Sequence, residues 1–220
     1  NFLQRFMINP KPPLTLILGG AKIDTKLGLI DQFLSKADYI LVGGGMAFTF
    51  LKAKGKEVGA SLVDEEMLSI AKSIMNKARI QNVRLILPED VICGGSIDDQ
   101  KPKGPFDINS VPKNLMGLDI GPKTLARYNG ILGESKTVVW NGPMGVFEKK
   151  GYEVGTREMG IHLVSCIANG TKVIVGGGDT ASALDDFDLL EEMTHVSTGG
   201  GASLELLSGN QLPALKVLEN

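Results

Sequence analysis

Histidine, cysteine and aromatic residues are all scarce in this chain. Two histidines, two cysteines and 5% aromatic residues are spread over 220 positions. Two histidines exclude a histidine-rich metal site and disfavour a histidine-based catalytic triad. Cys93 and Cys166 lack a CxxC spacing, and such isolated thiols suit a reducing compartment better than a disulfide framework. We therefore expect a cytoplasmic protein.

An excess of one charge sign and long apolar runs are also absent. The 23 basic and 25 acidic residues nearly cancel, and the basic residues form no run. This balance argues against a nucleic acid or a membrane surface as partner. No apolar run approaches the ~18–20 residues of a membrane span, and no signal peptide opens the chain. We expect neither nucleic acid nor membrane among the partners.

Glycine, by contrast, is abundant and unevenly placed. The chain has 28 glycines, about twice the usual share of ~7%. Three triple-glycine runs, at 43–45, 176–178 and 199–201, each follow a short apolar run. A strand that ends in glycines and turns into a helix directs free backbone N–H groups at an anion, which no Cβ keeps away. One such turn can serve packing alone, but three together favour a nucleotide ligand.

Short apolar runs alternate with helical periodicity along the chain. Residues 22–35, 64–78, 155–169 and 199–207 have the helical pattern, with Asp64 as an N-cap. The stretch from Cys93 to Lys113, rich in Gly, Pro and Asp, predicts one long loop. The strand candidates are nearly continuous in apolar or β-branched residues, as strands covered on both faces should be; they are 14–18, 39–42, 83–87, 137–140, 172–175 and 195–197.

This alternation predicts an α/β fold. We expect a doubly wound, mostly parallel six-stranded sheet with helices on both faces, a Rossmann-like three-layer α/β/α arrangement. Ligands of such sheets bind outside the carboxyl ends of the strands, where the glycine runs lie.

Two lysines and one aspartate are the first candidate site residues. Lys22 and Lys26 share one face of a helix start, where lysines oppose the helix dipole unless an anion lies between them. The alternative is two solvated lysines, with Lys26 pairing with Asp24. Asp179 directly follows the second glycine run, and its position suits an N-cap and a Mg²⁺ ligand equally.

Two motif tests narrow the class of nucleotide site. No GxxxxGK[ST] motif is present, so the chain is not a P-loop protein. GGGDTA fits the GxGxxA pattern of a dinucleotide site, but that site needs an acidic residue after the next strand. Here the next strand is followed by TGGG. A dinucleotide-binding dehydrogenase domain is therefore a weak alternative.

The first thirteen residues resemble the end of a longer helix followed by a linker. Phe2 and Phe6 lie on one apolar helical stripe that has no start signal before it, and prolines at 10, 12 and 13 end the segment. We expect the chain to be a piece of something larger.

Seven motifs together resemble the C-terminal half of phosphoglycerate kinases. They occur in that family's order across residues 14 to about 213: GGAKIDTK, VGGGMAFTFL, LPED, GLDIGP, VVWNGPMGVFE, VGGGDTASA and HVSTGGGASLELL. The resemblance covers nearly all of this chain but half of the family's enzyme. It implies an interdomain helix end and linker at 1–13, a nucleotide-binding domain at 14–207, and a tail at 208–220 that returns toward an N-terminal domain.

The resemblance also implies an activity. The family transfers a phosphoryl group reversibly between 1,3-bisphosphoglycerate and ADP, giving 3-phosphoglycerate and ATP. Its C-terminal domain binds the Mg²⁺-nucleotide, its N-terminal domain binds the phosphoglycerate, and a hinge closes the two together. The full-length protein is expected to be a monomer, and this chain alone to bind nucleotide with little or no kinase activity.

Roles for single residues follow from the same resemblance. Lys22 and Lys26 would contact the nucleotide phosphates, Asp179 would ligate Mg²⁺ and Thr180 would support the phosphates. Gly177 and Gly178 belong to the same nucleotide-binding turn. The helix N–H groups of Gly199, Gly200 and Gly201 would contact the transferred group. Asn141 and Pro143 would lie beside the phosphate and ribose, and Glu148 would accept the ribose hydroxyls. The adenine slot would consist of Gly20, Ala21, Gly44, Leu62, Gly117 and Leu118.

Such a reaction needs positioning and charge neutralisation more than a general base, which suits a chain without a plausible catalytic histidine. Ile97 stands where the family often has an aromatic residue beside the adenine.

A stand-alone nucleotide-binding module, acting as a sensor or regulated by a partner, remains the alternative from another functional class.

Overall fold

A computed structural model describes residues 9–197 of the chain. The apolar stripe at the start of the chain, the third glycine run and the predicted helix at 199–207 lie outside the described residues.

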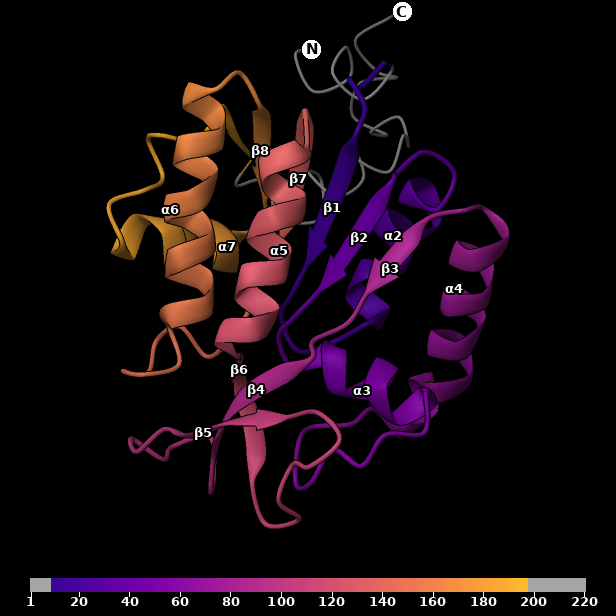
Figure 1. Cartoon of the computed structure of the whole chain (residues 1–220), viewed down its shortest axis with the longest axis vertical. Helices are drawn as coiled ribbons and strands as arrows, with labels where there is room; N and C mark the ends of the chain where they lie inside the picture. Colours follow the sequence, from indigo (N-terminus) through magenta and orange to yellow (C-terminus); the bar gives the residue numbers. More distant parts are fainter. Residues whose placement is uncertain (1–8, 198–220) are drawn as a thin grey trace, which may run out of the picture.

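A six-stranded parallel sheet forms the centre of the molecule (Figure 1). All six predicted strands are confirmed, in the spatial order β3-β2-β1-β7-β8-β9. Every neighbouring pair is parallel. The strands are β1 Leu14–Leu18, β2 Tyr39–Val42, β3 Arg84–Ile86, β7 Thr137–Asn141, β8 Lys172–Gly176 and β9 His195–Ser197.

Helices cover both faces of this sheet, so the predicted three-layer α/β/α fold is confirmed. On one face α2 (Leu27–Phe33), α3 (Met46–Ala53) and α4 (Leu68–Ile80) bury a cluster that includes Phe33 and Phe50. On the other face α5 (Pro122–Glu134), α6 (Val154–Ala168) and α7 (Gly178–Asp186) pack around Trp140 and Tyr128. The strand order reverses between β1 and β7, and ligands of doubly wound folds bind at such a switch point.

A second, antiparallel sheet corrects the predicted long loop at 93–113. It consists of β4 (Asp90–Gly94), β5 (Lys103–Asp107) and β6 (Met116–Ile120), in the order β5-β4-β6. Figure 1 shows it at the end of the molecule where α3 and α5 begin. β5 has the sequence KGPFD and is largely exposed, so no apolar run marked it as a strand. A small core with Phe48, Val91 and Cys93 joins this sheet to α3.

Two helix predictions also need correction. The predicted helix at 22–35 begins as a short 3-10 turn, Asp24–Lys26, before α2. Asp64 precedes a second 3-10 turn, Glu65–Met67, but its side chain makes no capping bond. Its backbone N–H instead donates to the Thr49 hydroxyl at 3.0 Å. α5 was not predicted: its buried face, Thr124, Tyr128 and Leu132, has helical spacing, but Gly130 and Gly133 lower its helix propensity.

No helix in residues 9–197 is long and apolar enough to cross a membrane.

Candidate functional site

Four turns meet at the carboxyl ends of β1, β2, β7 and β8. Backbone bonds join the turns after β1, β2 and β7: Gly19 N–H donates to Asn141 O, Gly20 N–H to Pro143 O, and Gly44 N–H to Met144 O, each at 2.9 Å. Gly44 has φ +63°, and a Cβ there would lie 2.5 Å from Gly20 N. Close packing between turns is therefore one reason for glycine at this edge of the sheet.

An apolar cavity of about 250 Å³ opens beside these turns. Its lining includes nine of the residues predicted for the nucleotide, namely Gly20, Ala21, Gly44, Leu62, Gly117, Leu118, Pro143, Glu148 and Asp179. Leu62 and Ile97 also line it, although 53% and 54% of their surfaces are exposed. A Cβ on Gly117 would lie 2.0 Å from the Phe48 ring, so glycine there lets the ring form one wall. We call this cavity the apolar arm.

A second cavity of about 430 Å³, which has more polar side chains in its lining, continues from the apolar arm, and we call it the polar arm. The two share Gly20, Ala21 and Asp179, so together they form one cleft. The other predicted residues on this polar arm are Lys22, Lys26, Asn141, Gly177, Gly178 and Thr180. The structure thus brings together every predicted site residue that it describes, and Gly199, Gly200 and Gly201 lie outside the described residues.

Lys26 is the best-placed cation of the polar arm. Its ammonium group donates to Asn141 Oδ1. Burial lowers the pKa of Lys26, and the nearby Asp179 carboxylate acts in the opposite direction. The alternative pairing with Asp24 is not formed, since the Asp24 carboxylate accepts the Thr25 N–H at 2.8 Å.

The polar arm also presents an unused hydrogen-bond donor. Asn141 Nδ2 is buried and has no partner in the described part of the chain. An unpaired buried donor costs free energy, and a phosphate oxygen in the polar arm would satisfy it. Lys26 and Asn141 together therefore favour an anionic ligand.

Asp179 and Thr180 lie in the first turn of α7. The N-cap of this helix is Gly177, with φ +92°, so Asp179 is not the N-cap. Its exposed carboxylate borders both arms of the cleft. The Thr180 hydroxyl accepts the Gly142 N–H at 2.6 Å and donates to Gly176 O at 3.1 Å, so it ties α7 to the turn after β7.

The donor set fits a magnesium ion held jointly with a ligand. Residues 9–197 contain no group of three or more His, Cys, Asp or Glu side chains that could hold a metal. Mg²⁺ commonly takes one or two carboxylates and completes its shell with phosphate oxygens and water. Asp179, a single exposed carboxylate next to Lys26, fits that mode and not a closed protein cage.

Asp119 is a feature of the cleft that sequence reasoning missed. It lies on the wall of the apolar arm, is 3% exposed, and accepts the N–H groups of Ile120 at 2.8 Å and Gly155 at 2.7 Å. Burial raises the pKa of Asp119 to about 8, against the effect of these two donors. A carboxylate within the otherwise apolar run MGLDI was the available sign.

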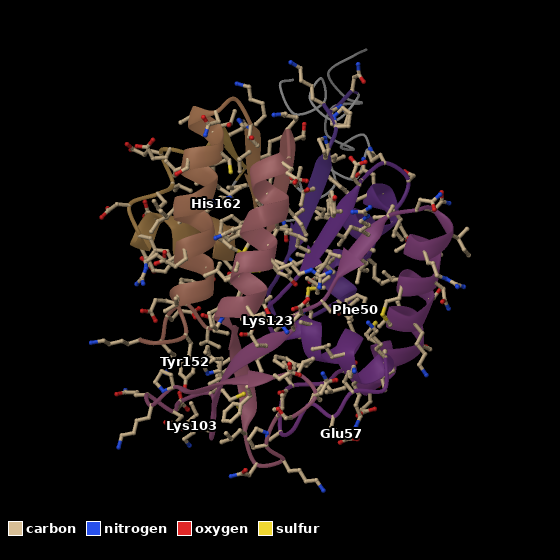
Figure 2. All side chains as sticks on the ribbon, viewed as in Figure 1. Phe50, Glu57, Lys103, Lys123, Tyr152 and His162 are labelled. Carbon is tan, nitrogen blue, oxygen red and sulfur yellow. The ribbon has the colours of Figure 1, made fainter. Side chains whose placement is uncertain are left out.

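Neither histidine lines the cleft. His162 lies on α6, away from the second sheet (Figure 2), and its Nε2 is buried without a partner among residues 9–197. His195 lies in β9. The cleft therefore offers lysine, amide and carboxylate groups and no imidazole.

Comparisons with known proteins agree with this geometry. A family model described as phosphoglycerate kinase matches residues 1–210. A phosphoglycerate kinase of Bifidobacterium adolescentis is 48% identical over 99% of this chain and 55% of its own length. One of Thermosipho africanus is 44% identical over the whole chain and 55% of its own length.

Two solved structures that resemble this chain are also phosphoglycerate kinases. The phosphoglycerate kinase structure from Coxiella burnetii has a TM-score of 0.90 at 44% identity, and the match covers 98% of this chain and 55% of that one. The phosphoglycerate kinase structure from Pyrococcus horikoshii has a TM-score of 0.81 at 28% identity, and the match covers 99% of this chain and 54% of that one. The chain thus spans about half the length of the relatives that it matches.

Proposed function

This chain belongs to the phosphoglycerate kinase family, and from that premise we propose that it is the nucleotide-binding half of such a kinase. The observation that carries the proposal is the continuous cleft, with an apolar arm of the size and lining a nucleobase needs and a polar arm with Lys22, Lys26 and Asp179. Apolar walls with a few convergent polar groups are typical of small-ligand sites.

In this proposal the base lies in the apolar arm and the phosphates in the polar arm. The base would pack between Leu62 and the wall formed by Gly117 and Leu118, with Gly20, Ala21 and Gly44 on the glycine-turn side. Glu148 would accept the ribose hydroxyls, and Pro143 would lie at the junction of the two arms.

Charge neutralisation is the task of the polar arm. Lys22 and Lys26 would contact the phosphates, with Lys26 nearest the transferred group and Asn141 Nδ2 donating to a phosphate oxygen. The first turn of α7, with the Gly178 N–H, adds the positive end of a helix dipole. The Gly177 N–H already donates to Ser197 O at 3.3 Å, so Gly177 would contribute through the shape of the turn. Gly199, Gly200 and Gly201 would add a second set of N–H groups.

Magnesium would be held by Asp179 together with phosphate oxygens. When bound, the ion neutralises phosphate charge and fixes the geometry of the phosphate chain. Thr180 would position Asp179 by holding the first turn of α7 against Gly142.

The reaction proposed for the whole protein is reversible phosphoryl transfer between 1,3-bisphosphoglycerate and ADP, in the cytoplasm. The phosphoglycerate would bind to the part of the relatives that this chain does not span. Because the nucleophile is a phosphate or carboxylate oxygen, no general base is required, in keeping with a cleft that has no histidine.

Calorimetric titration of MgADP into the chain tests the proposal. We expect binding that weakens at least tenfold in Lys26→Ala, and in Asp179→Asn chiefly when Mg²⁺ is present. Lys172→Ala, an exposed lysine on β8 that lines neither arm, is the matched control and should bind as the unaltered chain does. Binding that is insensitive to both Lys26→Ala and Asp179→Asn would place the nucleotide elsewhere and refute this assignment.

A stand-alone nucleotide-binding module is the second candidate, because the chain spans only about half of its relatives. Catalysis restored by adding the other half of a relative would decide for the kinase, whereas tight binding without any restored turnover would favour the module. Competition by NAD(H) against MgADP would instead favour a dinucleotide site.

A further inference from the structure

A groove runs along the free edge of the six-stranded sheet, at β3. Two adjoining cavities of about 660 and 410 Å³ share Lys54 and the segment 85–87, so they form one surface, which we call the edge groove. The first cavity lies between β3 and helices α3 and α4, and the second continues to the end of β5 and the start of α5. The edge groove shares only Pro88 with the nucleotide cleft.

β3 has one residue, Leu85, whose backbone groups face this groove. Arg84 N–H donates to Asp38 O at 3.0 Å, toward β2, and Leu85 is paired in parallel register with Ile40. Because bonding groups alternate along a parallel strand, the N–H and C=O of Leu85 face away from β2. Ile86 O lies on the inner side, where it accepts the Tyr128 hydroxyl at 3.2 Å. Such an open strand edge is a template for an added strand.

The first cavity has an unbalanced charge. Its lining includes the basic residues Lys54, Lys72, Arg79 and Arg84 and no acidic residue. Arg84 donates to the Tyr39 hydroxyl and lies over its ring. Within residues 9–197, Lys54, Lys72 and Arg79 make no ion pair. The chain as a whole has a net charge of −2, so this cation row is a local feature.

The second cavity extends the positive surface. It adds Lys56, Lys123 and Arg127, and Figure 2 shows Lys123 near the end of α5 that borders the second sheet. Glu89 there is already paired with Lys123 and Arg127. Asp107, the other acidic residue of the lining, accepts the Asn109 N–H at 2.9 Å. The acidic groups present are thus engaged within the protein, and so are Lys123 and Arg127, which leaves Lys56 as the added cation without an ion pair among the described residues.

Apolar side chains complete the groove. Met75, Leu85 and Leu87 line the first cavity and are only partly buried. An extended segment with alternating side chains would place apolar residues against them and acidic residues toward the cations, since successive side chains of a strand point to opposite sides.

The geometry points to the edge groove as a docking site for an extended acidic peptide segment of another protein, which adds a strand to β3 opposite Lys54, Lys72 and Arg79. A second copy of this chain fits poorly, because pairing two β3 edges would bring two cation rows together. A nucleic acid would meet the charges but would leave the backbone groups of Leu85 without strand partners.

Fluorescence anisotropy with a labelled ten-residue peptide of alternating glutamate and valine tests the proposal on the 220-residue chain. We expect saturable binding that weakens at least tenfold in the variant Lys54→Glu/Lys72→Glu/Arg79→Glu and at raised salt. The control variant Lys113→Glu/Lys136→Glu/Lys172→Glu makes the same charge change at exposed lysines outside the groove and should bind within about twofold of the unaltered chain. Circular dichroism melting of both variants verifies that each is folded.

Four further outcomes would overturn the proposal. The same peptide with alternate backbone amides N-methylated should lose binding at least tenfold, and equal binding would mean that charge alone attracts it. A single-stranded oligonucleotide of equal charge that displaces the peptide at equal concentration would point to nucleic acid instead. Concentration-dependent dimerisation in sedimentation velocity, abolished by the groove variant, would assign the edge to a second copy. Absence of peptide binding would mean that the lysines only protect an open edge from pairing.

Discussion

Asp119 is a residue whose burial should make stability depend on pH. Its folded pKa, raised by burial to about 8, lies above the ~3.9 of an unfolded aspartate. The folded state therefore holds a proton that the unfolded state loses between these two values. The contribution to stability is complete below pH ~4 and is lost as the pH rises toward 8, with a slope of up to about 1.4 kcal/mol per pH unit.

We predict that Asp119→Asn flattens this dependence. Urea unfolding between pH 5 and 8, without nucleotide, should show a steeper fall in unfolding free energy for the unaltered chain than for Asp119→Asn. Asp99→Asn is the control, because backbone hydrogen bonds from Gly95 and Lys101 hold the pKa of Asp99 low, outside this window. Parallel slopes for the unaltered chain and Asp119→Asn would show that Asp119 is ionised throughout.

Gly44 and Gly55 test whether close packing between turns matters at the cleft. Both have positive φ, +63° and +84°. A Cβ on Gly44 would lie 2.5 Å from Gly20 N, whereas a Cβ on Gly55 would have no atom within 4 Å. We predict that Gly55→Ala costs only the conformational penalty of about 1 kcal/mol, and that Gly44→Ala costs at least about 1 kcal/mol more. Denaturant unfolding of both variants measures the difference, and equal losses would contradict this account of the turn.

At the scale of elements, the Thr180 hydroxyl ties the first turn of α7 to the turn after β7, in addition to the core packing of Leu184. Gly142 N–H donates to Thr180 Oγ1 at 2.6 Å, and both groups are buried. Thr180→Val should leave that N–H unpaired at a cost of about 1–3 kcal/mol and should weaken MgADP binding by displacing Asp179. Thr180→Ser keeps the hydroxyl and should bind MgADP as the unaltered chain does, although it loses a buried methyl group. Equal affinity for Val and Ser variants would show that the hydroxyl does not position α7.

The elements also show which parts of the fold the sequence could predict. The six central strands were predictable because a strand covered on both faces must be apolar throughout, as in LTLIL of β1. β5 was not, because it is mostly exposed and its pairing with β4 depends on contacts that its own residues do not encode. α5 was missed because its two interior glycines lower helix propensity. Asp64 does occupy an N-cap position, but it precedes a 3-10 turn and its side chain makes no capping bond.

The cleft itself was predictable for a related reason. Glycine turns, lysines and Asp179 all follow the carboxyl ends of predicted parallel strands, and such ends meet at one edge of the sheet. Phe48 and Asp119 were not predicted, because they reach the cleft from α3 and from β6, and no local pattern shows that those elements close its wall. Gly117 and Leu118, which also lie on β6, were predicted only through the family resemblance.

At the scale of the whole molecule, the described residues that line the two arms of the cleft include two cations, Lys22 and Lys26. The cations of the cleft, Lys22 and Lys26, are both needed for the nucleotide phosphates in our proposal. We therefore predict that the 220-residue chain binds MgADP and shows no measurable turnover of phosphoglycerate with MgATP.

Adding the corresponding remaining half of a phosphoglycerate kinase as a separate polypeptide should restore turnover, because transfer needs both substrates held in line and water excluded. A coupled assay for ADP release measures this. Lys26→Ala in the chain should abolish the restored activity, whereas Lys172→Ala should retain it, which separates repair of this cleft from contaminating kinase. Robust turnover by the chain alone would mean that its described residues hold both substrates, and the division of labour proposed here would then be wrong.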